Sequence, residues 1–184
     1  GIPVNAPPAI NIDPLRRGDD REPWITGDGN TIYFKSDRLA TTVPRNNNDL
    51  FVTHKVNGGW TRPQLVGFPI STDDGDEHCP AILQDGKTLC FASRRDGGFG
   101  GSDIYCSEPD GDGNWLEPVN QGPSINTAAE EFHFSQDKDG MVYFTSNRPG
   151  GFGGMDLWGA MQTSKNQWGP ARNLGSQVNT AGSD

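Results

Sequence analysis

The acidic residues of this sequence recur at a regular spacing, and paired carboxylates are the groups that glycoside hydrolysis requires. Each of three Asp-Gly pairs has an acidic residue eight positions before its Asp, and a fourth acid stands one period further along. The four acids are Asp20, Glu77, Glu131 and Asp184, at spacings of 57, 54 and 53 residues. A residue that recurs in every repeat is expected to serve the repeat itself. We therefore interpret these acids as structural partners of three arginines that recur with them, Arg38, Arg95 and Arg148.

Two glycine-rich loops, residues 97–103 and 150–156, invite comparison with phosphate-binding loops. Such a loop needs a Gly-Lys-Ser/Thr sequence that opens a helix, whereas here a strand is expected to follow. We interpret the glycines as positions that need positive φ. The Asp that begins each following strand is expected to bind amides of its own loop. Phe99 and Phe152 at the loop tips are candidate ligand contacts, with packing onto a neighbouring repeat as the alternative.

Two acidic turns resemble calcium loops but lack the ligand spacing of an EF-hand. Their carboxylates are Asp110, Asp112, Asp137 and Asp139. We keep calcium as the one cofactor that these turns could hold, with an ordinary hairpin turn as the alternative. The three histidines, His54, His78 and His133, form no His-x-x-x-His pair, so no zinc site is expected.

The three cysteines, Cys79, Cys90 and Cys106, have no metal-ligand spacing. Repeat alignment places Cys90 and Cys106 on adjacent strands. A disulfide between them and three separate small core residues both fit the sequence.

The elements that must position these residues are short strands, because 25 Gly and 14 Pro in 184 residues suit tight turns rather than helices. An Asp-Gly pair between two short strands predicts a hairpin. In each unit a third strand begins at an Asp and a fourth at a tryptophan. Four antiparallel strands per unit of 50-odd residues predict a β-propeller blade. We assign residues 1–19 to a lead segment from a preceding blade and 20–76, 77–130 and 131–184 to three blades.

Segments 85–95 and 97–105 resemble the PD40 repeat of WD40-like β-propellers, which includes the propellers of Tol translocation proteins and of bacterial envelope proteins. The resemblance covers about residues 8–184. It implies a recognition propeller that is periplasmic, associated with the outer membrane or secreted. The first unit departs from the pattern, because its loop at residues 39–48 is longer and lacks the double glycines. That loop contains the least repeat-like polar stretch, and with Trp24 it is a candidate ligand site: Arg45, Asn46, Asn47 and Asn48.

Three blades are about half of a six-bladed ring, and propellers close with four to eight blades. We therefore expect either a homodimer that completes the ring or further blades from a larger protein. Unpaired blade edges would otherwise favour aggregation.

The formal charge of −9 argues against nucleic acid and anionic membrane surfaces as partners. No apolar run reaches the roughly 18 residues of a membrane span, so no membrane insertion is expected. The sequence favours a non-catalytic recognition or scaffold module that binds protein or glycan. One alternative is a polysaccharide lyase or hydrolase, in which His78, His133 and nearby carboxylates would converge. A structural assembly subunit is the other.

Overall fold

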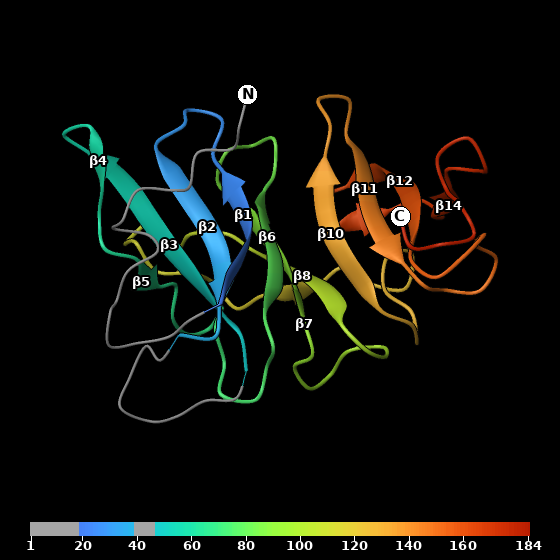
Figure 1. The fold of residues 1–184 in the computed structure, drawn as a ribbon, viewed down its shortest axis with the longest axis horizontal. Helices are drawn as coiled ribbons and strands as arrows, with labels where there is room; N and C mark the ends of the chain where they lie inside the picture. Colours follow the sequence, from blue (N-terminus) through green and yellow to red (C-terminus); the bar gives the residue numbers. More distant parts are fainter. Residues whose placement is uncertain (1–18, 39–46) are drawn as a thin grey trace.

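The structure is a computed structural model, and it describes residues 19–38 and 47–184. Every regular element in these ranges is a β-strand, and the strands form three antiparallel sheets that stand side by side (Figure 1). These sheets are the three predicted propeller blades, so the expected all-β fold is confirmed. In the same ranges there is no helix long and apolar enough to cross a membrane.

The strands follow the same order in each blade. The first blade contains β1 (Asp20–Ile25), β2 (Thr31–Ser36), β3 (Asp49–Val56), β4 (Gly59–Trp60) and β5 (Gln64–Leu65). The second contains β6 (His78–Ile82), β7 (Leu89–Ser93), β8 (Asp103–Ser107) and β9 (Val119–Asn120). The third contains β10 (Glu131–Gln136), β11 (Met141–Ser146), β12 (Asp156–Ser164), β13 (Gln167–Trp168) and β14 (Arg172–Asn173).

Each sheet has a path of four strands, and two sheets carry a fifth short strand. The paths are β1-β2-β3-β4, β6-β7-β8-β9 and β10-β11-β12-β13, while β5 pairs with β3 and β14 pairs with β12. The predicted tryptophan-led strand is therefore divided into two parts in the first and third blades. In the second blade Trp115 forms only an isolated bridge with Pro109 before β9 begins.

The Asp-Gly pairs form the hairpin turns between the first two strands of each blade. In the second blade Gly86 has a φ of 73° and donates its N–H to the carbonyl of Leu83 at 3.0 Å. Asp85 accepts hydrogen bonds from the N–H groups of Lys87 and Thr88, which closes the turn. The turns after β1, β6 and β10 lie together at one end of the blades, the top in Figure 1. We call this the turn end and the opposite one the loop end.

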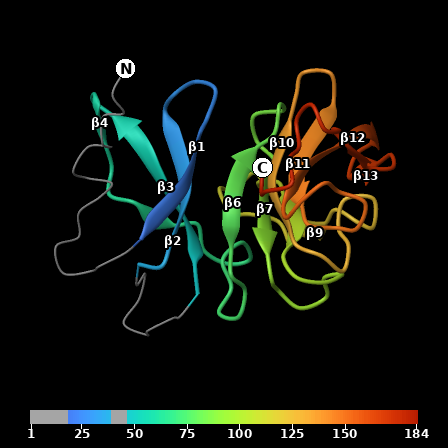
Figure 2. The same ribbon diagram turned by 45° about the vertical axis from the view of Figure 1, so that its right-hand side comes forward.

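The first strands of the blades, β1, β6 and β10, lie side by side in the middle of the molecule (Figure 2). Each has a bulge near its start, where the pairing register shifts. The residues at this position are Glu22, Cys79 and His133, with φ values of 53°, 50° and 55°. A positive φ is uncommon outside glycine. The bulges surround a cavity of about 250 Å³ on what we call the axial surface, the surface formed by these three strands.

Two hydrophobic clusters hold the blades together. The first seam, between blades one and two, contains Leu50, Ile70, Leu89, Phe91 and Tyr105. The second seam, between blades two and three, is larger and includes Phe134, Phe144, Trp158 and Trp168.

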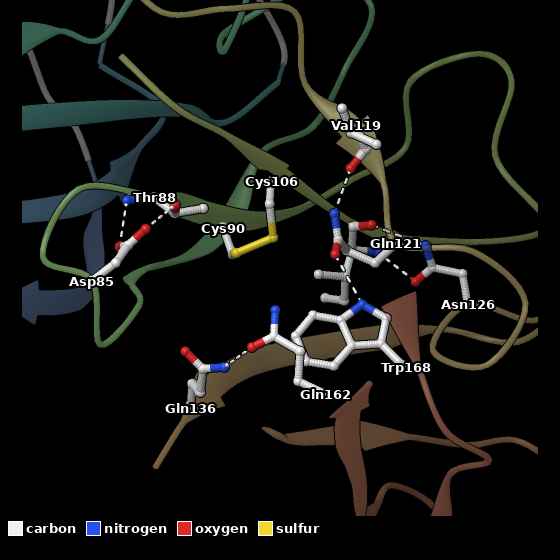
Figure 3. The surroundings of a disulfide bond; sticks show 11 residues. Asp85, Thr88, Cys90, Cys106, Val119, Gln121, Asn126, Gln136, Gln162 and Trp168 are labelled. Atoms are coloured by element: carbon white, nitrogen blue, oxygen red, sulfur yellow. Dashed lines mark hydrogen bonds between the residues drawn. A yellow bond between two sulfur atoms is a disulfide. The ribbon is translucent and has the colours of Figure 1, made fainter. Parts of the chain in front are cut away.

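A disulfide joins Cys90 on β7 to Cys106 on β8, and its surroundings are drawn in Figure 3. The sequence left open whether these two cysteines form a disulfide or are separate core residues, and the structure has the disulfide. Cys79 is a buried free thiol.

Candidate functional site

The recurring acids form buried clamps between consecutive blades. Glu77 has no exposed surface and accepts hydrogen bonds from Ser93 Oγ at 3.1 Å and Arg95 Nη2 at 3.3 Å. Its carboxylate also accepts from the N–H and the hydroxyl of Thr72, which belongs to the preceding blade. Burial raises the pKa of Glu77 to about 7, against the opposing charge of Arg95. The carboxylate thus links a threonine of one blade to a serine and an arginine of the next.

The same clamp recurs one blade further along. Glu131 accepts from Ser146 Oγ at 2.7 Å, from Arg148 at 3.2 Å and from both donors of Thr127. In blade one Asp20 pairs with Arg38. Each arginine also lies over two aromatic rings of its own blade: Phe34 and Phe51, Phe91 and Tyr105, and Phe144 and Trp158. The acids and arginines are therefore structural partners, as predicted.

The glycine-rich loops hold their exposed aromatic residues rigidly. Asp103 Oδ2 accepts the N–H of Phe99 at 2.8 Å, and Asp156 Oδ2 does the same for Phe152. The prediction that these acids bind their own loops is confirmed. The proposed reason for the glycines is only partly right, because among these loop glycines only the first of each loop has positive φ. At Gly100 a Cβ would lie 2.4 Å from the backbone of the next connector, so close approach explains that glycine.

The structure separates the predicted ligand residues. Phe99 and Phe152 are 49% and 51% exposed and lie in loops at the loop end, whereas Trp24 lies on β1 beside the turn end. Arg45 and Asn46 lie outside the described residues.

Asn47 and Asn48 are engaged as anchors of their loop. The Asn47 amide donates to the carbonyls of Thr72 at 3.0 Å and Asp73 at 3.2 Å. The N–H and amide of Asn48 both donate to Asp76 Oδ1.

The acidic turns use their carboxylates internally. Asp110 accepts the N–H groups of Asp112 and Asn114, and Asp137 accepts those of Asp139 and Met141. In the described part of the chain no three His, Cys, Asp or Glu side chains gather as a metal-binding group.

A groove opens in the first seam at the turn end, with a volume of about 720 Å³. Trp24, Tyr33 and Trp115 line it together with the turn residues of both blades. Volumes of roughly 300–1,000 Å³, lined mainly by hydrophobic and aromatic side chains with a few polar groups, are typical of ligand sites. We call this the seam groove. It is the candidate functional site, and Trp24 is the predicted residue that it contains.

A charged cluster crosses the same seam on the axial side. Lys35 Nζ lies 3.2 Å from Glu22 Oε1 and 3.0 Å from His78 Nδ1. His78 Nε2 lies 3.0 Å from Asp76 Oδ2, and its Nδ1 lies 3.8 Å from Glu22 Oε2. The cluster therefore joins β1 and β2 of blade one to β6 and the segment before it.

The electrostatics of this cluster follow from its opposite charges. Burial lowers the pKa of His78, but the carboxylates of Glu22 and Asp76 outweigh it and the net shift is upward. Burial favours the protonated form of Asp76, yet His78 and Asn48 outweigh it and bring the pKa of Asp76 to about 2. The pKa of Glu22 is lowered for similar reasons, including the hydrogen bond from the Cys79 N–H. Burial and the Glu22 charge raise the pKa of the Cys79 thiol, which keeps it protonated and unreactive.

Sequence reasoning missed Tyr33, Trp115, Lys35 and the pairing of His78 because it compared what the repeats share. The useful signal lies in positions where the repeats differ. Lys35 stands where the later blades have Ala92 and Thr145, and these three residues follow one another at the same register position beside the bulge.

Comparison with known proteins supports the fold. No family model matches the sequence, and no curated protein matches it. A solved TolB structure from Agrobacterium tumefaciens is similar, with a TM-score of 0.53 and 17% identity over 85% of this chain and 47% of that one. A puromycin-hydrolyzing peptidase from Mycobacterium tuberculosis has a TM-score of 0.53 and 14% identity, over 82% of this chain and 21% of the peptidase. This chain spans about half of the first protein and a fifth of the second, and at these identities the likeness concerns the propeller fold alone.

Proposed function

We propose that this propeller is a non-catalytic recognition module of the bacterial envelope or exterior, and that its partner, a protein or a glycan, binds in the seam groove. The observation that carries the proposal is that the recurring polar groups lie in the clamps, whereas a different set of aromatic groups lines the groove. The recurring acids, arginines and serines hydrogen-bond to one another in the clamps between blades. The groove, in contrast, is lined by the half-buried aromatic side chains of Trp24, Tyr33 and Trp115, none of which takes part in a clamp.

The assignment to the PD40 type and to the envelope is also part of this proposal. It is supported by the repeat pattern of the sequence and by the structural likeness to a TolB protein. The disulfide between Cys90 and Cys106 is compatible with an oxidising compartment such as the periplasm.

A second candidate is an enzyme that acts on polysaccharide, and one observation favours it. His78 lies between two carboxylates, Asp76 and Glu22, so a histidine and two acids do converge. Against this, Lys35 offsets the carboxylate charge within the cluster, and all four of its side chains are mostly buried. His133 hydrogen-bonds with Thr145 instead of joining it.

The function is tested by measuring binding and turnover on the same panel of envelope material. Purified protein is incubated with peptidoglycan sacculi, soluble polysaccharides and an envelope protein extract, and both retained partners and released fragments are measured. We expect one partner to be retained saturably and its retention to weaken when Trp24 is replaced by Ala. We expect no fragments to be released. Turnover that is lost in His78→Gln or His133→Gln would establish the enzyme instead.

We further propose that two copies associate as a six-bladed ring. Thr180 donates both its N–H and its hydroxyl to Asp184, as Thr127 does to Glu131. At Glu131 a serine and an arginine of the following hairpin complete the clamp, and another blade would supply these groups at Asp184. Light scattering should give a mass near twice 19.9 kDa. A monomer would contradict the association.

A further inference from the structure

We infer that the seam groove is a carbohydrate subsite that takes a neutral sugar ring against the indoles of Trp24 and Trp115. The inference rests on the proposed function for the location of the site and adds the chemical class of its ligand. It is carried by the shape of the groove, by the unused donors in it and by the charge around it.

The groove exists because two side chains that fill the second seam are replaced in the first. One counterpart is a glycine, and the other forms its hydrogen bonds within its own turn. In the second seam Leu83 packs against the core, and Gln84 Nε2 donates across to the carbonyl of Gln136 at 2.9 Å. The positions that precede the Asp-Gly turn of blade one hold Thr26 and Gly27 instead. Thr26 hydrogen-bonds within its own turn, and nothing lies within 4 Å of where a Cβ on Gly27 would be.

The seam groove, with its volume of about 720 Å³, lies at these positions, because Thr26 and Gly27 are part of its lining. The groove therefore results from the residues Thr26 and Gly27, while the hydrophobic cluster beside it is intact, and it is specific to the first seam.

The tryptophans of the two seams differ in their hydrogen bonds. Trp168 Nε1 donates to Gln121 Oε1 at 3.0 Å (Figure 3), and Trp158 Nε1 donates to the carbonyl of Ser146 at 3.3 Å. Within the described residues neither Trp24 nor Trp115 donates such a bond, and both are only half-buried. A buried tryptophan usually finds a partner for its N–H group. The groove is thus lined by two tryptophans whose N–H groups have no protein partner among the described residues.

This combination suits a sugar ring. One face of a pyranose carries C–H groups whose partial positive charge is attracted by the negative face of an aromatic ring. The hydroxyl groups around the ring accept hydrogen bonds, and Trp24, Trp115 and Tyr33, whose side chains each carry a donor, are part of the groove lining. A purely aliphatic ligand would leave these donors unsatisfied, which costs binding energy.

The charge around the groove favours a neutral sugar over an anionic one. Asp28 lines the groove itself, and the one lysine in its lining, Lys87, lies 3.7 Å from Glu108. The whole chain carries a formal charge of −9. Uronic acids and phosphorylated glycans would be repelled by this field.

The experiment titrates the folded protein with three probes while following tryptophan fluorescence and heat. The probes are the neutral oligosaccharides cellotetraose and chitotetraose, and tetragalacturonic acid as their anionic counterpart. The variants are Gly27→Gln, which fills the groove in the way Gln84 fills the second seam, and Trp115→Phe, which keeps the ring but removes the donor. Phe99→Ala is the control, since Phe99 is an exposed aromatic residue at the loop end, far from the groove.

We expect a neutral oligosaccharide to bind and shift the tryptophan emission, with affinity about tenfold weaker or more in Gly27→Gln and unchanged in Phe99→Ala. Trp115→Phe should weaken binding less, because stacking remains. The anionic probe should bind worse than both neutral probes. Circular dichroism confirms that each variant is folded before it is compared.

The other outcomes separate the two proposals. If no sugar binds but an envelope protein is retained and Gly27→Gln releases it, the carbohydrate inference is wrong and the proposed recognition function stands. If sugars bind equally well in Gly27→Gln and in the native protein, the subsite is not in the groove and the inference is overturned. If neither sugar nor protein binding responds to Gly27→Gln or Trp24→Ala, both proposals fail.

Discussion

The two seams of this molecule are built from the same repeat but are used differently. In the second seam Phe134 packs edge-on against Trp168, and the Cys90–Cys106 disulfide lies in the same cluster. In the first seam the corresponding space holds a charged cluster on the axial side and an open groove at the turn end. The carboxylate clamp is the same in both.

This difference shows how a repeat protein separates stability from recognition. The clamp and the apolar cluster can be repeated without loss because neighbouring blades need the same contacts. A binding site needs a place where the repeat departs from itself. The first blade departs from the later ones at Thr26 and Gly27, which line the seam groove, and at Lys35, which belongs to the charged cluster.

Removing the clamp should have the largest effect and should affect both seams alike. Replacing Glu77 or Glu131 by Gln leaves a buried arginine without its charge partner, which at a pH above the Glu77 pKa of about 7 costs about 3–5 kcal/mol of unfolding free energy. Urea unfolding of the two variants measures it, with exposed Asp96→Asn as control. If only one variant were destabilised, the clamps would not be equivalent and the comparison of the seams would have to include them.

Removing the disulfide should destabilise the second seam and leave the first seam unchanged. The bond closes a loop of 16 residues, and loss of such a cross-link costs about 3 kcal/mol in the chain-entropy model. We expect Cys90→Ala with Cys106→Ala to lower the free energy of unfolding, measured in urea, by that amount. The groove should keep its sugar affinity. Free-thiol titration of the native protein is the control, and more than one reactive thiol after unfolding without reductant would contradict the bond.

Filling the groove should make the first seam resemble the second. Gly27→Gln adds a side chain where there is open space and can donate to a carbonyl of blade two, so unfolding free energy should rise by about 1 kcal/mol. Thermal unfolding measures the change. Gly27→Ala, which cannot reach the neighbouring blade, is the matched control, and equal stability of the two would show that no bond across the seam forms.

The charged cluster should make the stability of the first seam depend on pH, and this is the smallest of the four expected effects. The pKa of His78 is raised in the folded protein by Glu22 and Asp76, against burial and Lys35. Its contribution is therefore complete below the ordinary histidine pKa of about 6.5 and is lost as the pH rises through the raised folded value. The stability difference between the native protein and His78→Gln should shrink across this window. A constant difference from pH 5 to 9 would contradict the assignment.

The blade architecture was predictable from the sequence because it depends on local and repeated signals. Asp85-Gly86 and its counterparts specify a hairpin by backbone preference alone, and three such hairpins with following apolar strands specify blades. The role of Asp103 and Asp156 in their loops was predictable for the same reason, since each binds amides only three or four residues away.

The seam groove and the charged cluster were decided by the tertiary structure. Trp24 and Trp115 are 91 positions apart in the sequence, and nothing local indicates that they line one groove. Glu22, Lys35 and His78 meet only because β1 and β6 pack side by side and both carry a bulge that redirects a side chain to the axial surface. Local preference determines how each blade folds, whereas the packing of one blade on the next determines which unshared residues meet.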